Sequence, residues 1–265
     1  MIHIFQVPFT GKTPRSDNQT QEWYDHRTDI FIQYTLESLK AQTNKNFVVW
    51  LTFRPQDIDN INTKKIETAL KESGLRFLMT FNGTMFTEDR ATWHNVDLVE
   101  RLDKTLPALK EFIGDTDYIY ETNLDSDDTV HETFSEIVCG KSFKNKGSLY
   151  MTNGYAFDPN GKLADWNNPT SNQNYTIMFP ADIYFDSDAR LNYLMGFKTH
   201  EEAPTLFDSE KLPDGLYCTL IHGQNISTLW DHPFRKGMYI MRDEDMKSKL
   251  AEFGIYSNKN ILSVI

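Results

Sequence analysis

The chain has 265 residues and a mass of 30.9 kDa, which is enough for one large domain or two small ones. Its 27 Lys and Arg residues against 38 Asp and Glu residues give a formal net charge of −11, which disfavours nucleic acid and anionic membranes as partners because both are negatively charged. The longest nearly unbroken apolar run, Phe47 to Phe53, is far shorter than the roughly 18 residues of a membrane-spanning helix, so we expect no transmembrane segment.

The opening residues, Met1 to Phe9, are apolar but lack the basic flank and the length of a secretory signal, so they predict a first core strand. Two cysteines, Cys139 and Cys218, are too few for a disulfide framework or a multi-cysteine zinc site. Both features favour a cytoplasmic, reducing environment, although a processed exported chain would look similar.

Helix-periodic apolar stretches then alternate with strand-like runs through the first half of the chain. Further strands are predicted at residues 47–53, 75–81 and 118–124. The helices between them are marked by Ile32, Leu36 and Leu39, by Ile66, Ala69 and Leu70 with Gly74 as the cap, and by Leu98, Leu102, Leu106, Leu109 and Ile113 with a kink at Pro107. This alternation predicts a layered α/β fold with a mostly parallel central sheet.

From about Ser148 the pattern loosens into short strands and polar loops, and the most polar stretch, residues 158–174, is expected to be functional. A late strand at residues 216–222 and a final helix ending at Gly254 complete the prediction. We expect one domain over residues 1–265 with an irregular, ligand-facing second half, and an antiparallel subdomain after residue 148 as the alternative.

Three carboxylates, Asp125, Asp127 and Asp128, follow the strand at residues 118–124 directly. Open α/β sheets bind their ligands at the carboxyl ends of strands. In extended backbone Asp125 and Asp127 project to the same side, and paired carboxylates favour a hard cation such as Mn²⁺ or Mg²⁺, whose remaining positions a diphosphate can fill. The alternative is that Asp128 caps a helix beginning near Val130 while Asp125 lies in a solvated turn.

Three segments of the chain resemble those of a rhamnosyltransferase family of bacteria and viruses, which belongs to the glycosyltransferases with a GT-A fold and an Asp-x-Asp motif. They are Ser38 to Phe47 (SLKAQTNKNF), Asn123 to Asp128 (NLDSDD) and Ile221 to Ser227 (IHGQNIS). The three occur in the family's order and span roughly residues 1–230. Asn123 replaces the arginine that usually precedes the acidic block.

The resemblance implies a GT-A-like, Rossmann-like α/β/α sandwich, with a nucleotide-sugar-binding half at residues 1–147 and an acceptor-binding half at residues 148–265. It also implies a metal-dependent transfer of a sugar from a nucleoside-diphosphate sugar, such as a UDP- or dTDP-sugar, to a glycan acceptor. The likeness suggests rhamnose as the sugar, and we expect inversion at its anomeric carbon. Metal binding is carried over to Asp125, Asp127 and Asp128. His222 is a further candidate ligand because imidazole binds Mn²⁺.

Residues at the ends of the first strands are expected to shape the donor site. Pro8 follows the first strand, together with Gln6 and Val7. Arg54 follows the second strand. Arg27, with Trp23, resembles the family's early arginine and tryptophan and is expected to contact the nucleotide, as are Asp125 and Arg90.

An inverting transfer also needs a group that removes the proton of the acceptor hydroxyl. The candidates are Glu201, Glu202 and Asp182, with Asp165 less favoured and Trp166 as a platform for an acceptor sugar. The second Asp-x-Asp, at residues 186–188, is interpreted as a surface turn.

Two other functions fit parts of the sequence. Asp125 to Thr129 also reads as the Asp-x-Asp-x-Thr nucleophile motif of haloacid-dehalogenase-type phosphatases, although that family places the motif on its first strand. A non-catalytic carbohydrate-binding or Ca²⁺-binding module would use the acids as a cation site and aromatic side chains as sugar platforms.

Overall fold

The computed structural model describes residues 1–10, 20–82, 96–142, 147–168, 171, 173–194, 200–206, 208–223, 240–241 and 243–256, with only the backbone described at 96–99, 101, 203, 206, 240 and 243. Its strands are β1 (Ile2–Pro8), β2 (Phe47–Thr52), β3 (Phe77–Thr80), β4 (Tyr118–Asn123), β5 (Asp128–Val130), β6 (Gly147–Tyr150), β7 (Asn153–Asp158), β8 (Lys162–Asn167), β9 (Thr176–Pro180), β10 (Asp208–Lys211), β11 (Tyr217–Leu220) and β12 (Ile240–Met241). Its helices are α1 (Gln21–Ile30), the π-helical turn η2 (Phe31–Thr35), α2 (Leu36–Ala41), the 3₁₀ turn η3 (Pro55–Asp57), α3 (Ile61–Ser73), α4 (Val96–Ile113), α5 (Phe134–Cys139), α6 (Ala181–Tyr184), α7 (Ser187–Tyr193), the 3₁₀ turn η5 (His200–Glu202), α8 (Ala203–Leu206) and α9 (Asp243–Ala251).

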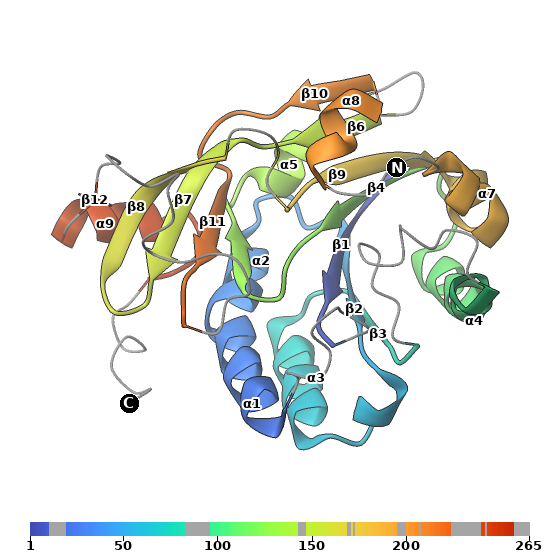
Figure 1. Ribbon diagram of the computed structural model, residues 1–265, viewed down its shortest axis with the longest axis horizontal. Helices are drawn as coiled ribbons and strands as arrows, with labels where there is room; N and C mark the ends of the chain where they lie inside the picture. The colour runs from blue at the N-terminus through green and yellow to red at the C-terminus, as the bar shows by residue number, and fades with distance from the viewer. Residues whose placement is uncertain are drawn as a thin grey trace.

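A seven-stranded sheet forms the centre of the molecule, in the order β10-β6-β9-β4-β1-β2-β3 (Figure 1). Every strand except β9 runs in the same direction, because β9 is antiparallel to both β4 and β6 while the remaining neighbours are parallel. The predicted α/β class with a mostly parallel central sheet is therefore confirmed.

Helices cover both faces of this sheet. One face of β1 packs on α1, η2, α2, α3 and α5 through a core that includes Phe5, Phe31 and Ile66. The other face packs on α4, α6 and α7 through Ile4, Leu106 and Tyr184. Since both faces are covered, β1 and β2 are buried along their whole length, as the nearly unbroken apolar run at residues 47–53 predicted.

The helical periodicity located the long helix and its buried face. Leu102, Leu106 and Leu109 are at most 2% exposed, and Pro107 lies inside α4 without ending it. Gly74 caps α3 with a φ of 71°, a backbone conformation that glycine adopts without the strain that a Cβ atom would add. Within the described part of the chain, no helix combines the length and apolar character needed to cross a bilayer.

The second half of the chain contains more regular structure than the sequence predicted. Its strands β6, β9 and β10 extend the central sheet, and β7, β8, β11 and β12 join β5 in a separate five-stranded sheet in the order β12-β8-β7-β11-β5. β8 lies inside the stretch predicted as a polar loop. Exposed and buried positions do not alternate regularly along this short strand. The alternation of polar and apolar residues that marks a strand is therefore weak in its sequence.

Candidate active site

The acidic block lies where the chain crosses from the central sheet to the second sheet. β4 ends at Asn123, and β5, which begins at Asp128, pairs with β11 of the second sheet. Asp125 and Asp127 therefore lie at the carboxyl end of a strand next to β1, as predicted. The alternative in which Asp128 caps a helix near Val130 is wrong, because residues 128–130 form a strand and α5 begins at Phe134.

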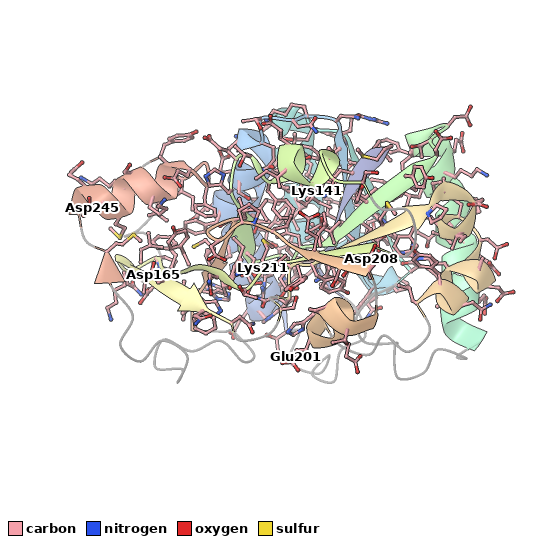
Figure 2. The ribbon with its side chains drawn as sticks, turned by 90° about the horizontal axis from the view of Figure 1, so that it is seen from above. Lys141, Asp165, Glu201, Asp208, Lys211 and Asp245 are labelled. Carbon is pink, nitrogen blue, oxygen red and sulfur yellow. The ribbon has the colours of Figure 1, made fainter. Side chains whose placement is uncertain are left out.

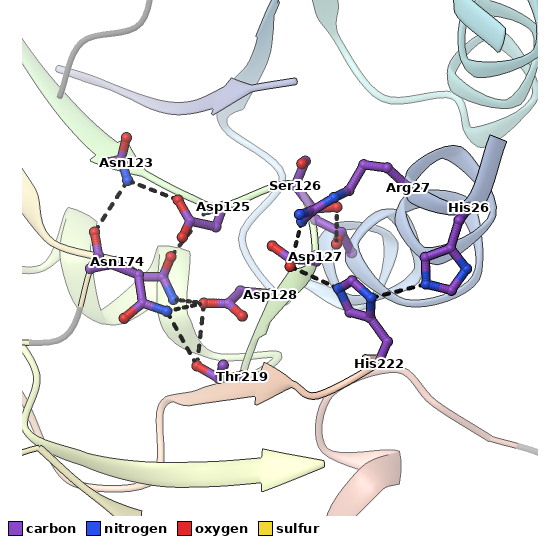
Figure 3. Close-up of polar contacts among 12 residues, drawn as sticks. His26, Arg27, Asn123, Asp125, Ser126, Asp127, Asp128, Asn174, Thr219 and His222 are labelled. Carbon is purple, nitrogen blue, oxygen red and sulfur yellow. Dashed lines mark hydrogen bonds and ion pairs between the residues drawn. The ribbon is translucent and has the colours of Figure 1, made fainter. Parts of the chain in front are cut away.

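Asp127 is held by two side chains from distant segments. Its Oδ2 atom forms an ion pair with Arg27 of α1 and accepts a 3.0 Å hydrogen bond from His222 Nε2, which follows β11 (Figure 3). Arg27 also lies over the Trp23 ring, with its guanidinium carbon 5.2 Å from the ring centroid. Burial by itself would raise the pKa of Asp127, but the positive charge of Arg27 and the hydrogen bond from His222 lower it to about 2.

A second histidine completes a chain of polar contacts that starts at Asp127. His26 Nε2 lies 2.9 Å from His222 Nδ1. Because a carboxylate only accepts hydrogen bonds, neutral His222 carries its hydrogen on Nε2 and its Nδ1 accepts from His26. Burial, followed by the neighbouring His222 and Arg27, lowers the pKa of His26, so the neutral form of that ring is favoured.

Asp128 is buried and Asp125 is half-buried, and the two lie in different surroundings. Asp128 Oδ2 accepts hydrogen bonds from Gln173 Nε2 and Asn174 Nδ2, each at 2.8 Å, while Asp125 accepts a 3.5 Å bond from Asn123 Nδ2. Burial and the nearby carboxylates raise the pKa of Asp128 well above its usual range and that of Asp125 to about 6, with burial as the larger cause. The pKa of Asp127 is thus lowered while those of Asp125 and Asp128 are raised, so the charged form is favoured most strongly at Asp127.

Several atoms of the predicted Mn²⁺ or Mg²⁺ ligands are already engaged in contacts with other side chains. Asp127 Oδ2 is shared by two donors, both ring nitrogens of His222 are engaged, and Asp128 Oδ2 accepts from two amides. Among the residues that the structure describes, no three His, Cys, Asp or Glu side chains are grouped so that they could bind one metal ion. The four predicted ligands do not fit a shared cation in this arrangement, and the metal stays a prediction of the sequence.

The SLKAQTNKNF segment holds the chain that follows the acidic block. Gln42 Nε2 donates to the backbone oxygen of His131 at 2.8 Å, and its Oε1 accepts from the Ser135 backbone N–H at 2.9 Å. Thr35, in the π-helical turn before the segment, donates to the Ser126 backbone oxygen at 3.1 Å. Helix α2 and this turn therefore fix the backbone on both sides of Asp127, which gives the segment a physical role.

The structure brings only some of the predicted donor residues to the acidic block. Arg27 and His222 reach Asp127 directly. Pro8 is buried at the carboxyl end of β1, whereas Arg54 is committed to a bidentate ion pair with Asp57, at 2.8 and 2.9 Å. Arg90 lies outside the described residues.

The predicted proton acceptors lie apart from the acidic block. Asp182 follows β9, whose last residue Pro180 pairs with Tyr118 at the start of β4, so Asp182 lies at the opposite edge of the sheet from Asp125. Glu201 and Glu202 form η5, which leads through α8 to the amino end of β10; Figure 2 shows Glu201 at the periphery.

The residues considered for an acceptor sugar lie on the second sheet. Asp165 is exposed on β8, as Figure 2 shows, and Trp166 is only 6% exposed and belongs to the core. Both line a cleft of about 440 Å³ together with Asn153, Gly154, Tyr155, Asn167, Asp214 and Gly215. The second Asp-x-Asp begins α7 instead of forming a free turn, since Asp186 accepts a hydrogen bond from the Ala189 N–H.

Sequence reasoning missed several residues of the site. His26, Gln173 and Asn174 reach the block through His222 and Asp128, and Thr219 donates to Asp128 Oδ2 at 3.3 Å. Two signals pointed to them: His26 neighbours Arg27 on α1, and Gln173 and Asn174 end the polar stretch expected to be functional. Their partners lie more than 40 residues away, so spacing alone does not reveal the contacts.

Comparisons with known proteins give little further identification. No family model and no curated protein matches the chain. Among solved structures, one described as a nucleotide-diphospho-sugar transferase from Desulfovibrio desulfuricans G20 aligns with a TM-score of 0.39 and 14% identity, over 82% of this chain and 80% of that chain. The inositol-1-phosphate CTP transferase from T. maritima aligns with a TM-score of 0.41 and 10% identity, over 96% of each chain. Both TM-scores are below 0.5, so neither likeness is used to assign a function.

Proposed function

We propose that this protein is a glycosyltransferase that moves a sugar from a nucleoside-diphosphate sugar to a glycan acceptor, with the acidic block at the centre of its donor site. The observation that carries the proposal is the convergence on Asp127: a buried carboxylate at the carboxyl end of a central parallel strand is bound by Arg27 and His222, which come from segments about 100 residues away on either side. Perturbed carboxylates joined to residues from distant segments are typical of functional sites.

The chain's own residues supply the charge and the rigidity that such a transfer needs. Arg27 carries a permanent positive charge into the block, and we propose that its guanidinium contacts the donor's diphosphate as negative charge develops on the leaving group. The ion pair with Asp127 and the contact with Trp23 hold that guanidinium in place before the donor arrives. A cation at Asp127 Oδ2 would compete with Arg27 and His222 for that oxygen.

The finer assignments rest on the family resemblance. We include rhamnose as the transferred sugar and inversion as the stereochemical outcome on that ground, and we assign no proton acceptor because Glu201 and Glu202 lie apart from the acidic block. Asp182 is left out because it lies at the opposite edge of the sheet from Asp125.

A thermal-shift panel with UDP, dTDP, GDP, CDP and their sugars, each with Mn²⁺, Mg²⁺ or EDTA, tests the proposal. A ligand that binds only the folded state raises the melting temperature by mass action, so we expect one nucleoside diphosphate to shift the protein. Equal shifts with and without EDTA would remove the predicted metal while leaving the nucleotide assignment in place. No shift with any nucleotide would contradict the proposal and favour the phosphatase or carbohydrate-binding alternatives.

The same assay on Asp127→Asn tests the site. We expect this variant to lose the nucleotide shift and sugar transfer, because the neutral amide no longer pairs with Arg27. Asp188→Asn is the matched control, since Asp188 is an exposed member of the second Asp-x-Asp. A folded Asp127→Asn protein as active as the parent would overturn the role of the block.

A further inference from the structure

The cleft of about 440 Å³ on the second sheet lies where β7 begins and β8 ends. A volume of roughly 300–1,000 Å³ is typical of small-molecule sites, so this cleft is large enough to hold a ligand. Its polar and glycine lining comes from these two strands and from the chain that leads into β11: Asn153, Tyr155, Asp165, Asn167, Asp214 and Gly215. We call the cleft with these six residues the outer cleft.

The strand register puts four side chains of the outer cleft on one face of the second sheet. Asn153 pairs with Asn167, and Tyr155 pairs with Asp165. Paired residues share a face, as do residues two apart on one strand, so all four side chains lie on the same side. The next pair along that face is apolar and packs on α9. The outer cleft is therefore the part of this face that lies beyond the helix.

The outer cleft is separate from the acidic block. Thr219 of β11 contacts Asp128 on one face of the second sheet, whereas its neighbour Cys218 pairs with Tyr155 and lies on the other face. In addition, β7 is two strand spacings, about 10 Å, from β5, where Asp128 lies. A ligand in the outer cleft therefore does not occupy the proposed donor site.

Some of the polar groups in the outer cleft are held in place by the fold, and others are available to a ligand. Asp214 Oδ2 accepts a 2.9 Å hydrogen bond from Asn153 Nδ2, and its Oδ1 lies 2.9 Å from Lys211 Nζ. Asp165 and Asn167 are exposed (Figure 2 labels Asp165), and within the described part of the chain their side chains form no hydrogen bond or ion pair. These two side chains can reach a ligand without breaking a contact.

The charges beside the outer cleft disfavour an anionic ligand. Lys211 is paired with Asp214, and Lys249, which lies over the Tyr155 ring, is paired with Glu252. The uncompensated charge of the lining is therefore the carboxylate of Asp165, which repels phosphate, sulfate and uronic acid groups.

The remaining chemistry suits a sugar. Carboxylates accept hydrogen bonds from hydroxyl groups, and carboxamides both donate and accept, so Asp165 and Asn167 can bind neighbouring hydroxyl groups of one sugar ring. Tyr155 adds an aromatic ring with a polar end, which can contact both the apolar and the hydroxyl-bearing parts of a sugar.

We infer that the outer cleft is a binding site for a neutral glycan, separate from the site of sugar transfer. Its use as an anchor for the glycan acceptor rests on the proposed function, whereas glycan binding itself does not. An anchor of this kind keeps the end of a long acceptor at a high effective concentration near the acidic block.

A glycan array probed with the full chain in EDTA tests the inference, with neutral, sulfated and uronic-acid-containing glycans on the array. We expect the parent to bind neutral glycans. In calorimetric titrations of the neutral glycan that binds best, the double variant Asp165→Ala/Asn167→Ala should bind roughly tenfold more weakly, because two hydrogen-bonding side chains are lost. Both residues are exposed, so the double variant should keep the melting temperature of the parent. Asp188→Ala, which removes an exposed carboxylate on α7, is the matched control and should bind the glycan as the parent does.

Reciprocal measurements separate the two sites. Asp127→Asn is expected to lose the nucleotide-induced thermal shift and to keep glycan binding, while the double variant keeps the thermal shift and loses glycan binding. Glycan binding that is absent from the parent in EDTA, unchanged in the double variant or lost in Asp127→Asn would overturn the inference. A parent that binds a neutral glycan through the outer cleft but shows no shift with any nucleotide would support the inference and contradict the proposed function.

Discussion

Acidification is expected to destabilise the fold through His3. This side chain lies on β1, is 0% exposed, and contacts Ser135 Oγ and Thr122 Oγ1. Its burial disfavours the charged imidazolium and lowers the pKa from 6.5 to about 3. The unfolded chain, in which the ring is solvated, therefore binds a proton at a higher pH than the folded protein does.

The sign and size of the effect follow from linkage. Below pH 6.5 the unfolded state holds the extra proton, so the free energy of unfolding falls as the pH falls, until the folded state also protonates near pH 3. One pKa unit corresponds to about 1.4 kcal/mol, so at pH 5 the loss attributable to His3 is about 2 kcal/mol, and at pH 7.5 it is close to zero. Fully buried, the ring is little screened by solvent.

Urea unfolding at pH 7.5 and pH 5.0 measures this contribution when the parent is compared with His3→Gln, whose side chain does not titrate. The raised pKa values of Asp125 and Asp128 act in the opposite direction, but they are common to both proteins and cancel in the difference. We expect the parent to lose about 2 kcal/mol more than the variant between the two pH values. Equal losses in the two proteins would refute the reasoning.

Two further predictions concern buried and exposed arginines. Arg190→Met leaves the Glu121 carboxylate buried without its cation and is expected to lower the free energy of unfolding by about 3–5 kcal/mol in urea titrations. Much of this loss should be recovered in the double variant that also carries Glu121→Leu. A single variant as stable as the parent would contradict the prediction. Arg27→Met is expected to reduce the nucleotide-induced thermal shift because it removes the cation beside Asp127, whereas Arg76→Met, which alters an exposed arginine over an aromatic ring, should leave the shift unchanged. Equal shifts in both variants would remove Arg27 from the proposed donor site.

Much of the central sheet could be predicted because its signals are local. The nearly unbroken apolar run at residues 47–53, the periodic leucines of α4 and the position of Gly74 each follow from burial or backbone geometry within one element. β8 and β10 were missed because short strands with mixed burial carry little periodicity.

At the candidate site, the sequence alone determined the class of fold and the position of the acidic block after a central strand. It also pointed to Arg27 and His222, through the resemblance of short segments. It did not determine which carboxylate each residue contacts, because Asp127 is bound from β11 and α1 across about 100 residues in either direction. Only the tertiary structure decided that Asp182 lies at the far edge of the sheet, since the antiparallel direction of β9 is a matter of strand pairing. Only it showed that the amide of Gln6 has no partner among the residues that the structure describes while that of Gln42 is satisfied, because partners are set by which strands and helices meet, and both residues are simply glutamines in the sequence.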